Sequence, residues 1–212
     1  MIDGCDGVGK STQVKLLAEV MEKAGVGVLS LRDPGGTAIG EKIRQILLDN
    51  GNQEMAVRCE ALLYMASRAQ LYQERIKPAL AEGKCVICDR WVSSTYAYQA
   101  VAGKIGTGTV LRIAEAALER TWPDLTIILD LPSEEGLKRI NPLFSDVKSM
   151  ETPGRGREFD RMEAKGSQFH QQVRRAFLEL AQGRPDFQVV SAAGNVNEVH
   201  ARICDIVSSF RF

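Results

Sequence analysis

The sequence predicts an α/β fold in which helices cover both faces of a parallel β-sheet. Three observations lead to this prediction. Short apolar runs alternate along the chain with longer segments of helical periodicity. Several apolar runs end in charged residues or glycine, which is typical of buried parallel strands whose carboxyl ends open into a site. The chain has 212 residues and no internal repeat, which fits one domain, residues 1–212.

The first predicted strand is unusually short, because only Met1, Ile2 and Asp3 precede a glycine-rich loop. Strands average about five or six residues. We expect either that the natural protein has further residues upstream or that its first strand is weakened. An intact-mass measurement on protein from its native source distinguishes these two cases.

The glycine-rich loop that follows is a phosphate-binding loop by pattern. Gly4-Cys5-Asp6-Gly7-Val8-Gly9-Lys10-Ser11 matches G-x-x-x-x-G-K-[ST] at every position. Glycines let successive N–H groups turn toward a phosphate, Lys10 adds a charge near the β and γ oxygens, and Ser11 can bind Mg²⁺. The next helix, about Ser11 to Ala24, directs its positive end at the same phosphates. We therefore predict an ATP-type site made by Gly4, Cys5, Asp6, Gly7, Val8, Gly9, Lys10, Ser11 and Thr12.

The remaining elements alternate in the order that a parallel sheet requires. Strands are predicted at 27–31, 84–90, 125–131 and 187–191, and helices at 38–49, 55–81, 93–99, 110–118, 158–182 and 195–209. Pro78 is expected to bend its helix, Ser133 to cap a short helix that ends at Arg139, and Asn195 to cap the last helix. Residues 140–157 lack periodicity and form a predicted lid.

Composition narrows the class of partner. The 27 basic and 27 acidic residues cancel, so bulk charge attracts neither nucleic acid nor a membrane. No apolar stretch reaches the roughly 18 residues of a membrane span and no leader resembles a signal peptide, so we expect a cytoplasmic protein. Cys85 and Cys88 match C-x-x-C, but residues three apart on a strand face opposite ways. We interpret them as buried apolar side chains rather than metal ligands.

Three loops are expected to meet at one edge of the sheet, because parallel strands bind ligands at their carboxyl ends. These are the phosphate loop, Asp33-Pro34-Gly35-Gly36, and Asp89-Arg90. Asp89 is placed to hold Mg²⁺ directly or through water. Arg44 and Arg90 are cations beyond those that one nucleotide needs, and they imply a second anionic substrate.

Five segments together resemble the thymidylate kinase family. They are Asp6 to Gln13, Arg32 to Thr37, Asp89-Arg90-Trp91, Ala97-Tyr98-Gln99 and Pro123 to Thr126, and the resemblance covers essentially the whole chain. It implies a P-loop NTPase fold with a five-stranded parallel sheet. It also implies transfer of the γ-phosphoryl group of ATP to dTMP with Mg²⁺, usually by a homodimer.

The resemblance also implies roles for individual residues. Arg44 and Arg90 grip the dTMP phosphate, Tyr64 stacks on the thymine, Arg68 bonds its O4, and Gln99 reads the base edge. Asp33 and Thr95 complete the predicted substrate-binding set, and Asp6 lies by the sugar or the acceptor phosphate. Alternative interpretations are an ordinary core aromatic for Tyr64 and a solvated helix cation for Arg68. Asp33 departs from the usual glutamate, Tyr96 from a smaller residue, and the lid is longer than is usual.

The cation that assists phosphoryl transfer is expected from the lid. Some family members carry an arginine inside the phosphate loop, but Gly7 occupies that place here. Arg155 and Arg157 are therefore the candidates for this cation, and Arg161 is a weaker third. Together with Lys10, Asp6 and Arg90, the two candidates make up the predicted catalytic set. A solvated basic loop is the alternative.

Other functions remain open from sequence alone. A kinase for dUMP or UMP is one alternative, because the methyl group that distinguishes thymine from uracil contributes only about 1 to 3 kcal/mol of discrimination. A nucleotide-binding regulator without turnover is a second alternative. A switch GTPase is disfavoured because the chain lacks an Asn-Lys-x-Asp motif.

Overall fold

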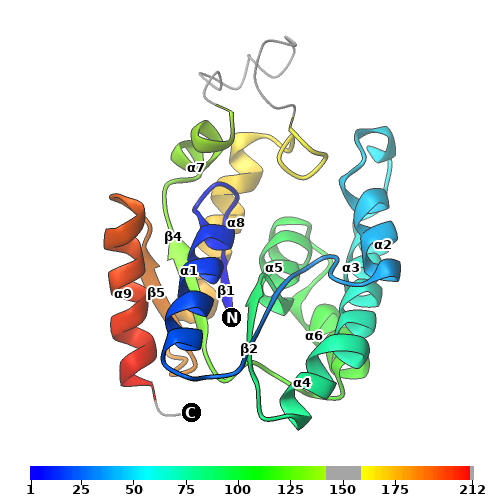
Figure 1. The fold of residues 1–212 in the computed structure, drawn as a ribbon. Helices are drawn as coiled ribbons and strands as arrows, with labels where there is room; N and C mark the ends of the chain where they lie inside the picture. Colours follow the sequence, from blue (N-terminus) through cyan, green and yellow to red (C-terminus); the bar gives the residue numbers. More distant parts are fainter. Residues whose placement is uncertain (142–158, 211–212) are drawn as a thin grey trace.

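One parallel sheet forms the centre of the protein (Figure 1). The structure is a computed structural model that describes residues 1–141 and 159–210. Within these residues the sheet has five strands in the order β2-β3-β1-β4-β5. They are β1 (Ile2–Gly4), β2 (Val28–Arg32), β3 (Cys85–Asp89), β4 (Thr126–Asp130) and β5 (Phe187–Ser191). The predicted α/β fold with a five-stranded parallel sheet is confirmed.

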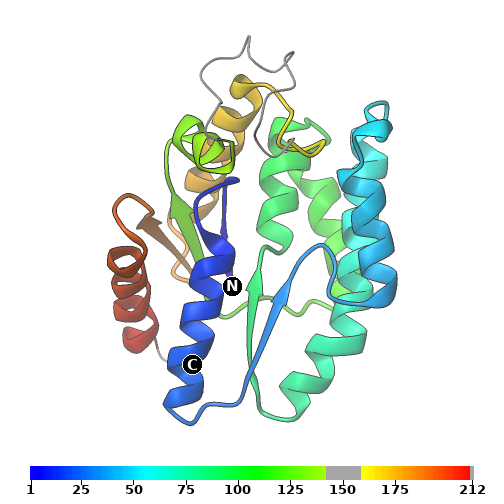
Figure 2. The same cartoon turned by 45° about the horizontal axis from the view of Figure 1, so that its top comes forward.

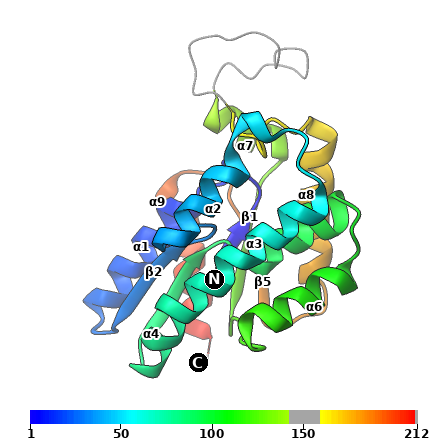
Figure 3. The same cartoon turned by 90° about the vertical axis from the view of Figure 1, so that its right-hand side faces the viewer.

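Helices lie on both faces of this sheet, as Figures 2 and 3 show from two further directions. One face carries α1 (Lys10–Lys23) and α9 (Val196–Ser209), and the other carries α3 (Val57–Leu71), α5 (Val92–Thr95), α6 (Thr107–Leu118) and α8 (Ser167–Ala181). α2 (Ala38–Leu48) packs against α3. Cys85 packs with one apolar cluster and Cys88 with the other, as expected for apolar side chains on opposite faces of the strand.

The helical segment predicted over 55–81 is not one regular helix. α3 is followed by a π-helical turn, η2 (Tyr72–Ile76), and then by α4 (Lys77–Ala81). Pro78 lies in the first turn of α4, and because proline has no N–H to donate, it interrupts the helical hydrogen bonding where η2 is followed by α4. A second π-helical segment, η3 (Tyr96–Ala102), continues α5. Apolar periodicity did not reveal either turn, because one extra residue leaves the buried face nearly unchanged.

Two predicted helix starts are wrong. α7 spans Ser133–Ile140, so Ser133 is its first residue rather than its cap, and the buried Ser133 Oγ has no partner among the described residues. α8 begins at Ser167 and not near Glu158. Asp160 Oδ1 accepts the backbone N–H groups of Met162 and Glu163 at 2.9 Å each, which holds this stretch as a turn. Asn195 does cap α9, in a reciprocal pairing with Glu198.

The central strand β1 makes fewer pairs with β3 than with β4. β1 pairs with β4 at three positions but with β3 only where Ile2 faces Asp89. Next to these strands lies an apolar cavity of about 450 Å³. It is lined on one side by residues that include Leu17 and Met21, and on the other by Tyr72 and Ile76.

Two further predictions are limited by which residues are described. The predicted lid falls almost wholly within 142–158, and Arg155 and Arg157 lie outside the described residues. Among residues 1–141 and 159–210, no helix is both long enough and apolar enough to cross a bilayer.

Candidate active site

A polar cavity of about 390 Å³ lies at the carboxyl ends of the central strands. Most of the predicted site residues line it: Asp6, Gly7, Gly9, Lys10, Ser11, Thr12, Asp33, Arg44, Tyr64, Arg68, Asp89, Arg90, Thr95 and Gln99. Gly4, Cys5 and Val8 belong to the loop but not to the cavity wall. The structure therefore brings the phosphate loop and the predicted substrate residues into one space.

The phosphate loop is packed so closely that side chains are excluded at two of its glycines. A Cβ on Gly7 would lie 1.9 Å from the carbonyl oxygen of Gly136 in α7, and one on Gly4 would lie 2.4 Å from that of Leu129. Both glycines have positive φ, 75° at Gly7 and 135° at Gly4. An arginine at position 7 is thus sterically incompatible with the position of α7.

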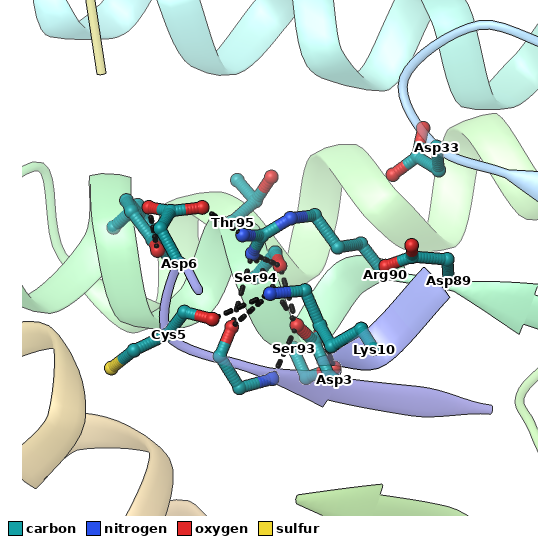
Figure 4. A network of polar contacts seen from close by, with 12 residues as sticks. Asp3, Cys5, Asp6, Lys10, Asp33, Asp89, Arg90, Ser93, Ser94 and Thr95 are labelled. Carbon is teal, nitrogen blue, oxygen red and sulfur yellow. Dashed lines mark hydrogen bonds and ion pairs between the residues drawn. The ribbon is translucent and has the colours of Figure 1, made fainter. Parts of the chain in front are cut away.

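Two cations, Lys10 and Arg90, direct their charged ends at the loop (Figure 4). Lys10 is 7% exposed, and its Nζ donates to the carbonyl oxygens of Gly4 and Cys5. Arg90 Nη1 donates to Gly4 O at 3.2 Å, and Arg90 has φ of 71°, a left-handed backbone that is unusual for a non-glycine residue. Burial lowers the pKa of Lys10. The carbonyl oxygens that both side chains contact are neutral acceptors that an anionic phosphate can replace.

Asp6 joins these cations to the wall of the cavity. Its carboxylate accepts a hydrogen bond from Arg90 Nη2 and another, at 2.7 Å, from the Tyr98 hydroxyl. Burial opposes ionisation, but the charges of Arg90 and Lys10 and the Tyr98 hydroxyl outweigh it and lower the pKa of Asp6 to about 2. Asp6 is therefore a carboxylate throughout the physiological range.

Sequence patterns missed the group that supports Arg90. Asp3 in β1 is fully buried, and it accepts hydrogen bonds from Ser93 Oγ at 2.6 Å and Ser94 Oγ at 2.7 Å. Arg90 Nη1 in turn donates to Ser94 Oγ at 3.0 Å. The only sequence signal was the run of three hydroxyl residues, 93–95, directly after a charged strand end. Figure 4 shows this network beside the loop.

Ser11 and Asp89 form the part of the site that suits a divalent cation. Ser11 Oγ is hydrogen-bonded to Asp89 Oδ2, while Asp89 Oδ1 is buried and has no hydrogen-bond partner among the described residues. A carboxylate and a hydroxyl are oxygen donors of the type that Mg²⁺ prefers. In the described ranges, no group of three or more His, Cys, Asp and Glu side chains is arranged so that it could hold a metal ion. A cation here needs phosphate oxygens and water to complete its ligands.

The far end of the cavity is built around a buried ion pair. Arg68 is fully buried and donates through Nε to Asp33 Oδ2 at 2.6 Å and through Nη1 to Thr95 Oγ1 at 2.6 Å. Burial, which outweighs the Arg68 charge, raises the pKa of Asp33 to about 6. Asp33 Oδ1 has no partner among the described residues. The interpretation of Arg68 as a solvated cation is wrong.

Three more predicted residues complete this end. Tyr64 lies one turn before Arg68 in α3, with the Arg68 guanidinium carbon 5.8 Å from the centre of its ring. Gln99 is 1% exposed and donates from Nε2 to Glu60 at 2.7 Å. Arg44 Nη1 donates to the carbonyl oxygen of Pro34 at 3.0 Å. Tyr64 therefore offers an aromatic surface to the cavity, beside polar groups of fixed orientation.

Arg161 does not take part in the cavity wall. Its guanidinium pairs with Glu60 at 2.6 Å, and its Nε donates to Leu47 O at 2.8 Å. The side chain is 2% exposed. These contacts tie the turn after residue 158 to α2 and α3.

A family model for thymidylate kinase matches residues 2–203. The chain belongs to the thymidylate kinase family. A relative named thymidylate kinase from Caldanaerobacter subterraneus subsp. tengcongensis is 40% identical over 98% of this chain and 93% of its own length. Another, from Fervidobacterium nodosum, is 36% identical over 98% of this chain and 97% of its own length. One from Thermoanaerobacter sp. (strain X514) is 41% identical over 98% and 96%, respectively.

Membership of the thymidylate kinase family confirms the resemblance on which the residue roles were based. It makes the chain a nucleotide-binding transferase of the nucleoside monophosphate kinase class. The alternative of a regulator without turnover is not favoured. The roles of individual residues remain predictions, which the geometry above allows us to develop.

Proposed function

We propose that this protein transfers the γ-phosphoryl group of ATP to dTMP and releases ADP and dTDP. Family membership supports the reaction. The observation that carries the proposal is one continuous cavity with the phosphate loop at one end and the Tyr64, Arg68 and Gln99 side chains at the other. A triphosphate and a pyrimidine monophosphate fit that pairing of an anion site with an aromatic, hydrogen-bonding site.

The ATP phosphates bind at the loop in this proposal. Lys10 exchanges its bonds to the Gly4 and Cys5 carbonyls for phosphate oxygens, which its position over the loop supports. Ser11 and Asp89 hold Mg²⁺, for which the unpaired Asp89 Oδ1 is the supporting observation. The ion supplies positive charge to the transferring group.

The monophosphate binds at the opposite end. Arg90 and Arg44 hold its phosphate, Tyr64 stacks on the base, and Arg68 donates to a base carbonyl. Asp33 and Thr95 act by orienting Arg68, to which both are hydrogen-bonded. Asp6 fixes Arg90 between the two phosphate sites. The chain thus orients two anions for direct transfer rather than supplying a nucleophile.

The transfer cation is proposed to be Arg157 or Arg155. The close contact of Gly7 with Gly136 supports this choice, because it excludes a loop arginine. Arg157→Ala is expected to lower kcat at least tenfold with little change in dTMP binding, measured by a coupled assay. Unchanged turnover moves the role to Arg155.

The proposal extends to assembly and location. We propose a homodimer that acts in the cytoplasm, as the family resemblance implies. Light scattering on the purified protein tests the dimer, and fractionation of the native cells tests the location.

The direct test of the reaction is ADP release from ATP and Mg²⁺, with dTMP, dUMP, UMP, CMP, AMP and GMP offered separately. We expect turnover with dTMP well above the others. Equal or higher turnover with dUMP or UMP would show that dTMP is not the preferred substrate. ATP binding without turnover on any monophosphate would contradict the proposal.

A further inference from the structure

The orientation of the Gln99 side-chain amide is set by a buried carboxylate outside the predicted site. Glu60 is fully buried in α3, and its Oε1 accepts the Gln99 Nε2 hydrogen bond at 2.7 Å. Its Oε2 is 2.6 Å from Arg161 Nη1 and 3.3 Å from Lys165 Nζ. Glu60 thus lies between two cations, and an ionised carboxylate accepts hydrogen bonds but donates none.

The hydrogen bond between Gln99 and Glu60 leaves the oxygen end of the Gln99 amide for a ligand. Because Gln99 must direct its NH₂ group at Glu60, its oxygen is the end that remains for the cavity that Gln99 lines. Gln99 Oε1 accepts no hydrogen bond from any residue in the described ranges. Arg68, by contrast, can only donate. The cavity therefore presents one fixed acceptor and one fixed donor.

The fold places these two groups together. Glu60, Tyr64 and Arg68 are spaced four residues apart and form one stripe along α3. Thr95, which accepts from Arg68, lies four residues before Gln99 on the continuous helical segment of α5 and η3. Arg68, Gln99 and Tyr64 therefore line the same cavity, with the Arg68 guanidinium carbon 5.8 Å from the centre of the Tyr64 ring.

We propose that Glu60 is a positioning residue for base specificity, because it fixes the Gln99 amide with its oxygen toward the substrate base. This inference rests on the proposed function. Thymine and uracil present a carbonyl beside a ring N–H, which matches a donor beside an acceptor. Cytosine presents an amino group beside an unprotonated ring nitrogen, which mismatches both. Reversal of the amide would remove half of this discrimination.

The test is Glu60→Gln, which replaces an obligate acceptor by a group that can also donate. The Gln99 amide is then free to turn. We expect the ratio of dCMP Kd to dTMP Kd, measured by calorimetry, to fall at least tenfold. The dTMP KM rises while kcat changes less than threefold, and ATP affinity is unchanged.

The charge balance around Glu60 supplies the controls. Lys165→Met removes one cation and leaves the Glu60–Gln99 bond, so its Kd ratio should equal that of the parent protein. The double variant E60Q/K165M loses one charge of each sign, which keeps the buried net charge constant and favours folding. It should show the same lowered ratio as E60Q.

Two results would overturn the inference. One is a folded E60Q/K165M variant whose Kd ratio stays within twofold of that of Lys165→Met. The other, which needs no variant, is an imino proton of bound ¹⁵N-labelled dTMP that exchanges with water as fast as in free dTMP. The proposed function itself fails differently, by lack of dTMP turnover in the parent protein.

Discussion

The two ends of the cavity are organised in opposite ways. At the phosphate end, Lys10 rests on the backbone carbonyls of Gly4 and Cys5, which a phosphate can displace, while Asp6 keeps Arg90 oriented. At the base end, Arg68 is held by Asp33 and Thr95, and Gln99 by Glu60, all in full burial. The comparison indicates that displaceable contacts lie at the phosphate end, where the phosphoryl group is transferred, and fixed contacts at the base end, where the base is recognised.

The largest expected effect is at the base end. Arg68→Met leaves the buried Asp33 without its partner, and breaking such a pair costs about 4 kcal/mol of unfolding free energy. Urea denaturation measures it. Arg32→Met, which removes the exposed pair with Glu41, is the matched control and should cost below about 1 kcal/mol. Equal losses for the two variants would refute the idea of a rigid base end.

At the phosphate end, the expected loss is in rate instead of stability. Lys10→Met should lower kcat on the order of 10²-fold, which corresponds to about 3 kcal/mol of barrier, because a charge near the transferring group is removed. The melting temperature should change little. Lys15→Met, on the exposed side of the same helix, serves as the control in the coupled assay. A loss below threefold for Lys10→Met would argue against its role.

The two aspartates should give opposite pH dependences of stability. The pKa of Asp6 is lowered from 3.8 to about 2, so its contribution is present above pH 3.8 and is lost as the pH falls toward 2. The pKa of Asp33 is raised from 3.8 to about 6, so the folded state retains a proton that the unfolded state releases. Stability therefore falls as the pH rises from about 4 to 6. Each shift corresponds to roughly 2 to 3 kcal/mol.

Substitution of each aspartate separates the contributions of Asp6 and Asp33 to the pH dependence of stability. Unfolding free energies measured from pH 2.5 to 8 should show that Asp33→Asn flattens the decline between pH 4 and 6. Asp6→Asn should flatten only the loss below pH 4. A single slope shared by both variants would mean that the two ends titrate as one unit.

The smallest expected effect concerns the strand that carries the phosphate loop. Three apolar residues added before Met1 can continue β1 between β3 and β4 and fill the apolar cavity there. Burial of their side chains, set against the entropy of ordering them, should leave a net gain of about 1 kcal/mol.

Thermal melting checks this gain. An extension of Val-Ile-Val should raise the melting temperature, whereas Gly-Ser-Gly should not. ATP affinity should increase with no change in the ratio of dTMP to dUMP turnover, because the base end is separate. No difference between the two extensions would show that the cavity does not accept a strand.

Sequence patterns by themselves determined the α/β class, the phosphate loop, the five strands and the cavity residues of the phosphate end, whereas Tyr64, Arg68, Thr95 and Gln99 came from the family resemblance. They could do so because parallel strands are short apolar runs, and because a triphosphate needs glycine, lysine and serine at fixed spacing along the chain. The starts of the helices at Ser133 and Ser167 were missed. A helix start depends on which local group accepts the first backbone N–H groups, and several nearby side chains could have done so.

Only the tertiary structure decided which polar residues support the site and which way they point. No sequence pattern singled out Glu60, and Asp3 was noted only as part of a short strand. Their partners lie 39 residues away at Gln99 and 90 residues away at Ser93. Buried polar contacts of this kind leave no local pattern, since their energy comes from exclusion of water by segments distant in the chain. The direction of the Gln99 amide was therefore decided by the fold.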